Sequence, residues 1–96
     1  MYRLRPLAQQ DIKQIYKTSK QEFGQIQADH YYSELFSSFR KLNERPDSGT
    51  DYTTVHPGLK GLHMQSHIIF YLITTSGEID IVRILHRRMD YHRHLS

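Results

Sequence analysis

The sequence predicts an α+β fold in which an antiparallel helical hairpin packs on one face of a mainly antiparallel sheet. Two observations lead to this class. Two stretches in the first half carry apolar residues at helical spacing, and three stretches in the second half are rich in β-branched and aromatic residues. Helices followed by strands are typical of α+β domains, where helices cover one face of a sheet. The predicted order is β-α-α-β-β-β, followed by a short C-terminal helix.

The length and composition indicate a single domain over residues 1–96. A chain of this size is too short for two halves that each bury a core. The apolar fraction of 38% and the charged fraction of 24% are ordinary for a globular protein. The chain has no cysteine, which excludes disulfides and thiolate chemistry and fits a reducing compartment. No stretch resembles an export signal or a membrane span, so we expect a cytoplasmic protein.

The first half contains a short strand and two helices. Residues 2–5 alternate as a strand does, and Pro6 suits the first turn of a helix, where its missing N–H has no helical partner. The spacing predicts a helix over about 6–22, ended by Gly24, and a second over about 25–43. So short a link makes the two an antiparallel hairpin. Their apolar stripes are Ala8, Ile12, Ile15, Tyr16, Ser19 and Phe23, and then Ala28, Tyr32, Leu35, Phe39 and Leu42.

The second half contains a loop and three strands. Residues 44–58 hold two prolines and two glycines without an apolar period, which predicts a loop. "LKGLHMQ", "HIIFYLITT" and "EIDIVRILH" then predict an antiparallel meander. The middle strand is apolar on both faces, so the sheet face opposite the hairpin must be partly open or covered by something else. "RRMDYHRHL" predicts one or two helical turns. The predicted core includes Ile12, Ile15, Leu35, Phe39, Ile69, Tyr71, Ile81 and Ile84.

Positive charge is concentrated at the C-terminal end. The net charge of +3 and the pI near 9.3 permit an acidic partner or a nucleic acid without requiring either. The last 14 positions hold one acid, Asp90, against four arginines and three histidines. Such a segment could recognise an acidic target, bind a metal or cleave RNA. Its cationic and titratable residues are Arg83, His86, Arg87, Arg88, His92, Arg93 and His94.

A metal site is not expected. His63 and His67 have H-x-x-x-H spacing, but zinc ligation at that spacing needs a helix, and this pair flanks a turn between strands. Exposed or hydrogen-bonded histidines near strand ends are the alternative. The chain also has no glycine-rich phosphate loop and no nucleophile elbow, so neither a cofactor nor acyl-transfer hydrolysis is expected.

Metal-free RNA cleavage is a stronger candidate, because it needs only a base, an acid and cations that hold the phosphate. Alternatively, Arg83 and His86 pair with Asp80, Asp90 or helix termini, and the neighbouring arginines are solvated. The residues that could supply a ribonuclease centre are Lys60, Arg83, His86, Arg87 and Tyr91.

Four stretches together resemble the ParE branch of the RelE/ParE toxin family. They are "PLAQQDIKQIY", "FGQIQADHYYSELFSSFRKLNERPDSG", "PGLKGLHMQSHIIFYLI" and "IDIVRILHRRMD". The resemblance covers residues 3–90, and its most specific parts are residues 57–60, 67–71 and 83–90. It implies a RelE/ParE-like fold and the toxin of a bacterial type II toxin–antitoxin system, neutralised by a ParD-like antitoxin.

The resemblance leaves two targets open, because the same fold serves both branches. ParE-like members poison DNA gyrase, whereas RelE-like members cleave messenger RNA on the ribosome. RelE-like ribonucleases carry a basic cluster around the middle strands, and here no Lys or Arg lies between Lys60 and Arg83. We therefore expect a gyrase inhibitor that is not an enzyme. A ribosome-dependent endoribonuclease using His86 and Tyr91 is the alternative.

Two binding surfaces are expected. Ile26, Tyr31 and Phe36 lie off the helical stripes, so they should contact an acidic, partly disordered antitoxin that lays a helix along the hairpin and extended chain along strand edges. No membrane partner is expected, and nucleic acid is expected only as gyrase-bound DNA. The residues expected to bind gyrase are Arg83, His86, Arg87, Arg88 and Arg93.

Overall fold

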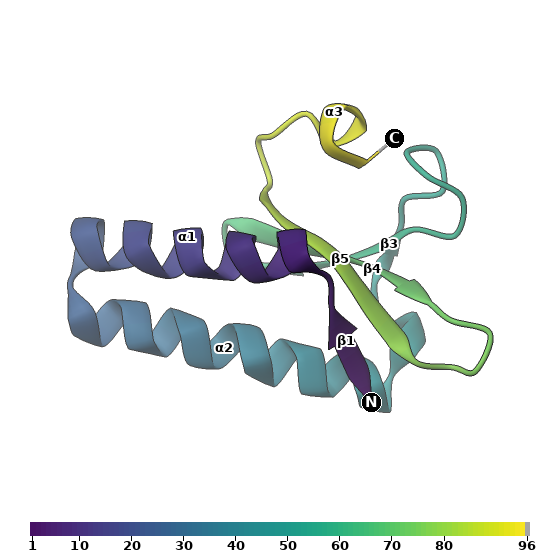
Figure 1. The fold of residues 1–96 in the computed structure, drawn as a ribbon, viewed down its shortest axis with the longest axis horizontal. Coiled ribbons are helices and arrows are strands. Elements are labelled where there is room, and N and C mark those ends of the chain that lie inside the picture. The colour runs from purple at the N-terminus through teal and green to yellow at the C-terminus, as the bar shows by residue number, and fades with distance from the viewer. Residues whose placement is uncertain (96) are drawn as a thin grey trace.

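The structure, a computed structural model, describes residues 1–95 and has the predicted α+β architecture (Figure 1). A helical hairpin lies on one side of a five-stranded sheet, and a short helix closes the chain on the other side. The elements are β1 (Tyr2–Leu4), α1 (Pro6–Phe23), α2 (Gln25–Glu44), the 3₁₀ turn η1 (Pro46–Ser48), β2 (Thr50–Asp51), β3 (Lys60–Met64), β4 (His67–Ile73), β5 (Ile79–His86) and α3 (Tyr91–Leu95).

The sheet has the strand order β1-β5-β4-β3-β2. The predicted meander of β3, β4 and β5 is confirmed as antiparallel, and β1 joins β5 in parallel. The expectation of a plain loop over 44–58 was wrong, because Thr50 and Asp51 pair with Gly61 and Lys60 as a fifth strand. The cause lies in β4: the buried Tyr71 hydroxyl donates to the Pro46 carbonyl at 2.6 Å and accepts from the Gly49 amide at 3.0 Å, which holds this segment beside the sheet.

The hairpin buries its apolar stripe against the sheet. Both helices begin and end within one residue of the predicted bounds. All eight predicted core residues belong to one buried cluster between hairpin and sheet. Two stripe residues were wrongly expected to be buried, since Phe23 is 67% exposed and Tyr32 is 45% exposed. The ends of both helices that meet at Gly24 project beyond the sheet, so no strand covers Phe23 (Figure 1).

Tyr31 and Phe36 pack against this core, although the apolar spacing placed them off the buried stripe. Tyr31 and Tyr32 both lie one helical turn before Leu35, and either could continue the stripe. Tyr31 is the one that packs at the β3–β4 turn, because its hydroxyl forms hydrogen bonds there with the Met64 carbonyl and His67 Nδ1. Tyr32 is left on the outer surface.

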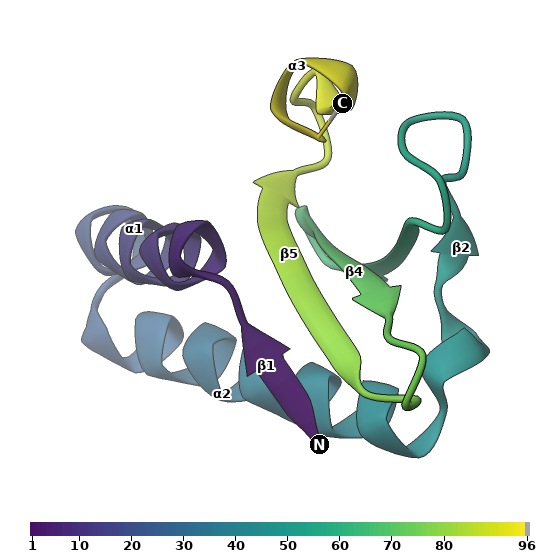
Figure 2. The same cartoon turned by 45° about the vertical axis from the view of Figure 1, so that its right-hand side comes forward.

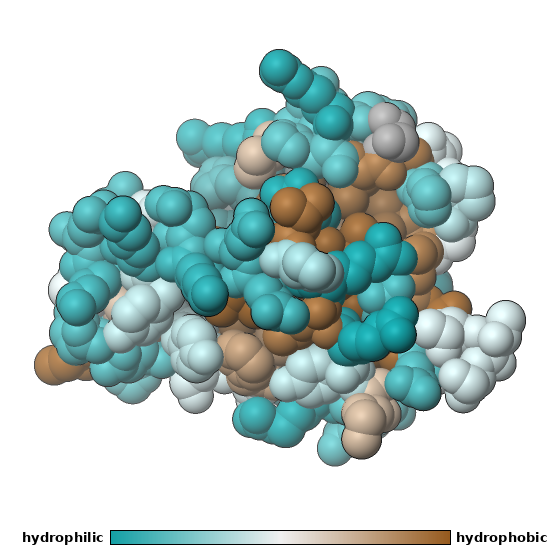
Figure 3. Space-filling view, viewed as in Figure 1, coloured by the Kyte–Doolittle hydropathy of each residue, from teal (hydrophilic) through white to brown (hydrophobic). Residues whose placement is uncertain are grey.

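The face of the sheet away from the hairpin is also covered. A second cluster is formed there by Leu59, Ile68, Phe70 and Leu85. The loop after β2 covers it with Tyr52 and Val55, and α3 covers it with Tyr91 and Leu95. Figure 2 shows α3 folded back above this side of β5. In Figure 3 the hydrophobic residues gather around the sheet, whereas the hairpin end is mostly hydrophilic. No helix within residues 1–95 is long and apolar enough to cross a membrane.

Candidate functional site

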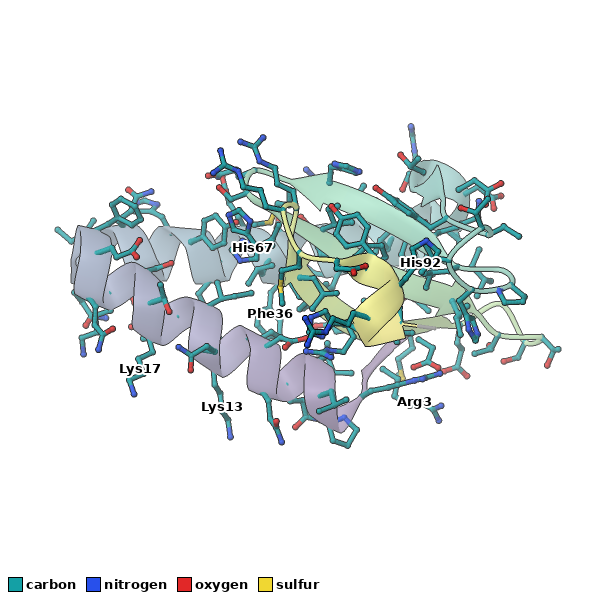
Figure 4. The ribbon with its side chains drawn as sticks, turned by 90° about the horizontal axis from the view of Figure 1, so that it is seen from above. Arg3, Lys13, Lys17, Phe36, His67 and His92 are labelled. Atoms are coloured by element: carbon teal, nitrogen blue, oxygen red, sulfur yellow. The ribbon has the colours of Figure 1, made fainter. Side chains whose placement is uncertain are left out.

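Two histidines mark one end of the sheet. His67 begins β4 and His86 ends β5, and the register places them directly opposite each other. Their rings are 5.4 Å apart between centroids. They line an open groove of about 600 Å³ that lies between α1, the start of α2, the β3–β4 turn and the end of β5. Here the hairpin meets the end of the sheet (Figure 4).

His67 is held from the hairpin side. Its Nδ1 is 2.7 Å from the Tyr31 hydroxyl, which also donates to the Met64 carbonyl at 3.3 Å. Burial, and then the nearby His86, lower the pKa of His67 from 6.5 to about 4. Burial also raises the pKa of Tyr31. Because both groups are neutral at pH 7, this wall of the groove offers hydrogen bonds and no fixed charge.

Arg83 also lines the groove, but its charge is already paired. Its Nε and Nη2 donate to the Asp11 carboxylate at 2.8 and 2.9 Å, and the side chains of Arg83 and Asp11 are only 17% and 14% exposed. The hydrogen bonds to Asp11 raise the pKa of Arg83 above its usual value. Arg83 was expected to contact a target, and in the structure its charge is engaged in an ion pair within the fold. Its partner is Asp11, whereas Asp80 pairs with Arg5 at 2.8 Å.

Two further ribonuclease candidates, Lys60 and Tyr91, lie elsewhere. On β3 the residue that pairs across the sheet with His67, and through it with His86, is Met64. Lys60 precedes Met64 by four residues on the same strand. Lys60 is thus roughly 13 Å away along the strand direction. Tyr91 begins α3 on the other face of the sheet, where its ring packs on Phe70 and its hydroxyl donates to the Arg87 carbonyl. Of the five candidates, only Arg83 and His86 line the same groove, so the five do not form one centre.

The exposed cations of the C-terminal segment are Arg87, Arg88 and Arg93. Their backbone is fixed: the Arg87 amide donates to the Ser66 carbonyl at 2.9 Å, and the Arg88 amide donates to Nδ1 of His86 at 3.2 Å. No ion pair within residues 1–95 engages their side chains. These three arginines, which we call the arginine surface, can therefore meet an external acidic partner.

The two histidines of the H-x-x-x-H pair lie on opposite faces of the sheet. His63 pairs with Ile68, which belongs to the cluster under α3. Nε2 of His63 is 2.8 Å from the Tyr52 hydroxyl. His67 faces Tyr31 on the hairpin side. Within residues 1–95 no three His, Asp or Glu side chains gather as a metal site would require.

The hairpin carries a second groove on its outer surface, of about 510 Å³. Phe36 and Tyr32 from α2 line it together with Ile12 and Tyr16 from α1, and Lys13 stands at its rim. Lys13 and Lys17 project away from the protein body (Figure 4). Of the predicted antitoxin contacts, Phe36 lines this groove, Tyr31 lines the groove at the sheet end, and Ile26 is 76% exposed at the start of α2.

Sequence reasoning missed the roles of Asp11, Tyr31 and His67 in the groove at the sheet end. One signal was available for His67. A meander with a two-residue turn at Gln65 and Ser66 fixes the register of β3 on β4, and a similar count across the next turn places His67 near His86. Asp11 gave no local signal, because its partner lies 72 residues later in the sequence.

Comparison with known proteins identifies the family. Residues 2–91 match the family described as the ParE toxin of type II toxin–antitoxin systems, parDE. Toxin ParE1 of Mycobacterium tuberculosis is 36% identical over 94 residues, which cover 98% of this chain and 96% of the relative. Toxin ParE1 of Caulobacter vibrioides is 31% identical over 94 residues, with the same coverage of each chain.

A solved structure supports the fold. A chain from the chromosomal ParDE toxin–antitoxin system of P. aeruginosa superposes with a TM-score of 0.76, covering 88% of this chain and 92% of that one at 18% identity. Together with the family match over nearly the whole chain, this shows that the protein belongs to the ParE toxin family of type II toxin–antitoxin systems.

Proposed function

We propose that this toxin inhibits DNA gyrase in the bacterial cytoplasm and is neutralised by a ParD-like antitoxin. Membership of the ParE family supports the proposal, because the resemblance implies this target and this type of antitoxin. The toxin would act as a binding protein and not as an enzyme. Ribosome-dependent cleavage of messenger RNA is the alternative.

The separation of the candidate catalytic groups is the observation that carries this proposal. His86 and Arg83 share a groove, but Arg83 is neutralised by Asp11, and Lys60 lies on another strand. The remaining candidate cation, Arg87, follows His86 in the chain but is exposed and does not line this groove. Metal-free phosphoryl transfer would need cations beside the acid and base. The arginine surface, in contrast, is exposed and unpaired within residues 1–95. Exposed cations accelerate association with an acidic protein or protein-bound DNA.

We propose that the antitoxin lays an amphipathic helix in the outer groove of the hairpin. The groove offers aromatic side chains at its floor and Lys13 at its rim, which suits a helix with one apolar face and acidic flanks. Phe36 keeps its predicted role as a contact. Ile26 would extend the apolar contact at the start of α2. Tyr31 is assigned to the other groove.

A paired assay tests the target. Purified toxin is added to a gyrase supercoiling and DNA-cleavage assay and, separately, to ribosomes translating a defined message. We expect gyrase to be inhibited while the message stays intact. The double variant R87A/R88A should weaken gyrase inhibition about tenfold or more, whereas K17A, which removes an exposed cation from α1, should leave it unchanged. Cleavage of the message that is lost in H86A, with gyrase unaffected, contradicts the proposal.

A binding measurement tests the partner. The toxin is titrated with the product of the adjacent antitoxin gene, and F36D is compared with K17A. We expect F36D to weaken the complex at least tenfold, because a carboxylate would be buried among aromatic rings in the outer groove. Equal affinity of F36D and wild-type toxin would exclude this groove as the contact.

A further inference from the structure

The segment that leads from β5 to α3 is held by hydrogen bonds that converge on His86 (Figure 1). The Met89 amide donates to the His86 carbonyl at 2.9 Å, which closes a β-turn over residues 86–89. Arg87 and Arg88 occupy the two central positions of this turn, and both are exposed. The turn therefore presents two consecutive arginines of the arginine surface to solvent.

The imidazole of His86 makes a second hydrogen bond inside the turn. The Arg88 amide donates to its Nδ1 at 3.2 Å. A side-chain acceptor that binds the backbone amide two residues later is the contact that asparagine and aspartate make in Asx turns. His86 thus takes the place of a short polar side chain, and its bond orients the peptide group between Arg87 and Arg88.

The other side of the imidazole packs against the fold. The rings of His86 and His67 meet edge to face, with centroids 5.4 Å apart. His67 is held in turn by the Tyr31 hydroxyl of α2, 2.7 Å from its Nδ1. A chain of contacts therefore runs from the hairpin through two imidazole rings to the Arg88 amide. This packing keeps Nδ1 of His86 directed at the turn.

The same hydrogen bond sets the state of the imidazole. Because Nδ1 of His86 accepts from the Arg88 amide, the proton of the neutral ring is on Nε2. The ring is partly buried, whereas the guanidinium groups that follow it are exposed. The position of His86 is thus better suited to placing these charges than to contacting an acidic target itself.

We propose that His86 is a positioning residue for the target, which acts by holding the turn that carries Arg87 and Arg88. The inference rests on the proposed function, gyrase inhibition through the arginine surface, and differs from the direct contact expected from the sequence. Without the bond to Nδ1, a target would have to order the turn as well as two long side chains, which lowers affinity. The loss of one such hydrogen bond corresponds to roughly fivefold.

Three substitutions separate the hydrogen bond from the ring. His86→Asn keeps an acceptor at the position of Nδ1, His86→Gln moves the acceptor further out, and His86→Ala removes it. We expect His86→Ala and His86→Gln to weaken gyrase inhibition about fivefold, and His86→Asn to restore it to within about twofold of wild type. Urea unfolding checks that each variant is folded. A folded His86→Asn that is as weak as His86→Ala overturns the inference.

A double-mutant cycle tests whether His86 acts through the arginines. His86→Ala is introduced into the wild-type toxin and into R87A/R88A. A positioning residue should cost about fivefold in the first background and little in the second, because the charges that it places are absent there. Equal costs in both backgrounds overturn the inference and leave gyrase as the target. If wild-type toxin does not inhibit gyrase, the proposed function fails and this role fails with it.

Nitrogen NMR of the wild-type imidazole tests the bond without a substitution. At a pH where the ring is neutral, we expect a protonated Nε2 and an unprotonated Nδ1. A neutral His86 with its proton on Nδ1 could not accept from the Arg88 amide. That result overturns the inference even if no variant of His86 folds.

Discussion

The carboxylate of Asp11 binds the guanidinium of Arg83 through two hydrogen bonds, of 2.8 and 2.9 Å. It also accepts a hydrogen bond from the Ile84 backbone amide at 3.0 Å. One side chain on the first helix therefore neutralises a mostly buried cation and caps the edge of the last strand. This contact joins segments that are 72 residues apart in the sequence.

Replacing Asp11 with alanine should destabilise the fold by about 2–4 kcal/mol, because it leaves a mostly buried guanidinium and a strand amide without an acceptor. Asp11→Asn should lose less, since it keeps an acceptor for the amide. Urea unfolding measures both, with Lys13→Ala, an exposed change on the same helix, expected within about 0.5 kcal/mol of wild type. An Asp11→Ala protein as stable as Lys13→Ala would show that the ion pair contributes nothing.

The stability of the fold should fall as the pH drops from about 6.5 to about 4. Burial and His86 depress the pKa of His67 to about 4 in the folded state, so the unfolded chain binds a proton first. The loss is complete below the folded pKa and, because His67 is only partly buried and partly screened by solvent, is on the order of 2 kcal/mol. Urea unfolding at several pH values in this range should show that the free energy of unfolding depends less steeply on pH for His67→Gln than for wild type. An NMR titration that finds the imidazole of His67 protonating above pH 6 would refute this assignment.

The β3–β4 turn holds backbone strain at Gln65, whose φ is +52°. A side chain at positive φ costs roughly 1 kcal/mol relative to glycine. Gln65 also donates to Glu34, and this exposed hydrogen bond offsets part of the cost. Gln65→Gly should therefore be more stable than Gln65→Ala by about 1 kcal/mol and unfold at a higher urea concentration. Both variants lose the hydrogen bond, and only glycine relieves the strain. If the two unfold together, the turn is not strained.

The sequence patterns predicted the helices well, because each buries a stripe whose spacing follows from helix geometry alone. The meander was predictable for the same reason. Contacts made by single polar atoms over long separations were not. Tyr71 looked like an ordinary core residue, and nothing local indicated that its hydroxyl fixes Pro46 and Gly49 beside the sheet.

The candidate site was harder to predict than the fold. Residue type marked Arg83 and Tyr91 as functional, yet Arg83 is paired with Asp11 and Tyr91 supports α3. Both roles depend on tertiary neighbours that spacing does not reveal. Arg87, Arg88 and Arg93 were predicted to bind the target; they are exposed, and their role in binding stays a prediction.

Variants of Tyr91 can distinguish gyrase inhibition from ribonuclease activity, because only a ribonuclease would use the Tyr91 hydroxyl. Its ring packs against Phe70 and Tyr52, with centroids 5.1 and 5.9 Å away, and its hydroxyl donates to the Arg87 carbonyl. If Tyr91 only holds α3 on the sheet, Tyr91→Phe should keep gyrase inhibition within about twofold, because the ring remains.

Tyr91→Ala should instead destabilise the fold by about 1–3 kcal/mol, since it removes a partly buried ring from the cluster under α3. Gyrase inhibition should then weaken, because α3 no longer holds Arg93 in place relative to Arg87 and Arg88. A ribonuclease that used the hydroxyl as its acid would lose about 100-fold or more of its message cleavage in Tyr91→Phe. Gyrase inhibition and message cleavage measured for both variants decide between the roles: Tyr91→Phe that is fully folded but inactive would make the hydroxyl, and not the packing, the functional feature of this residue.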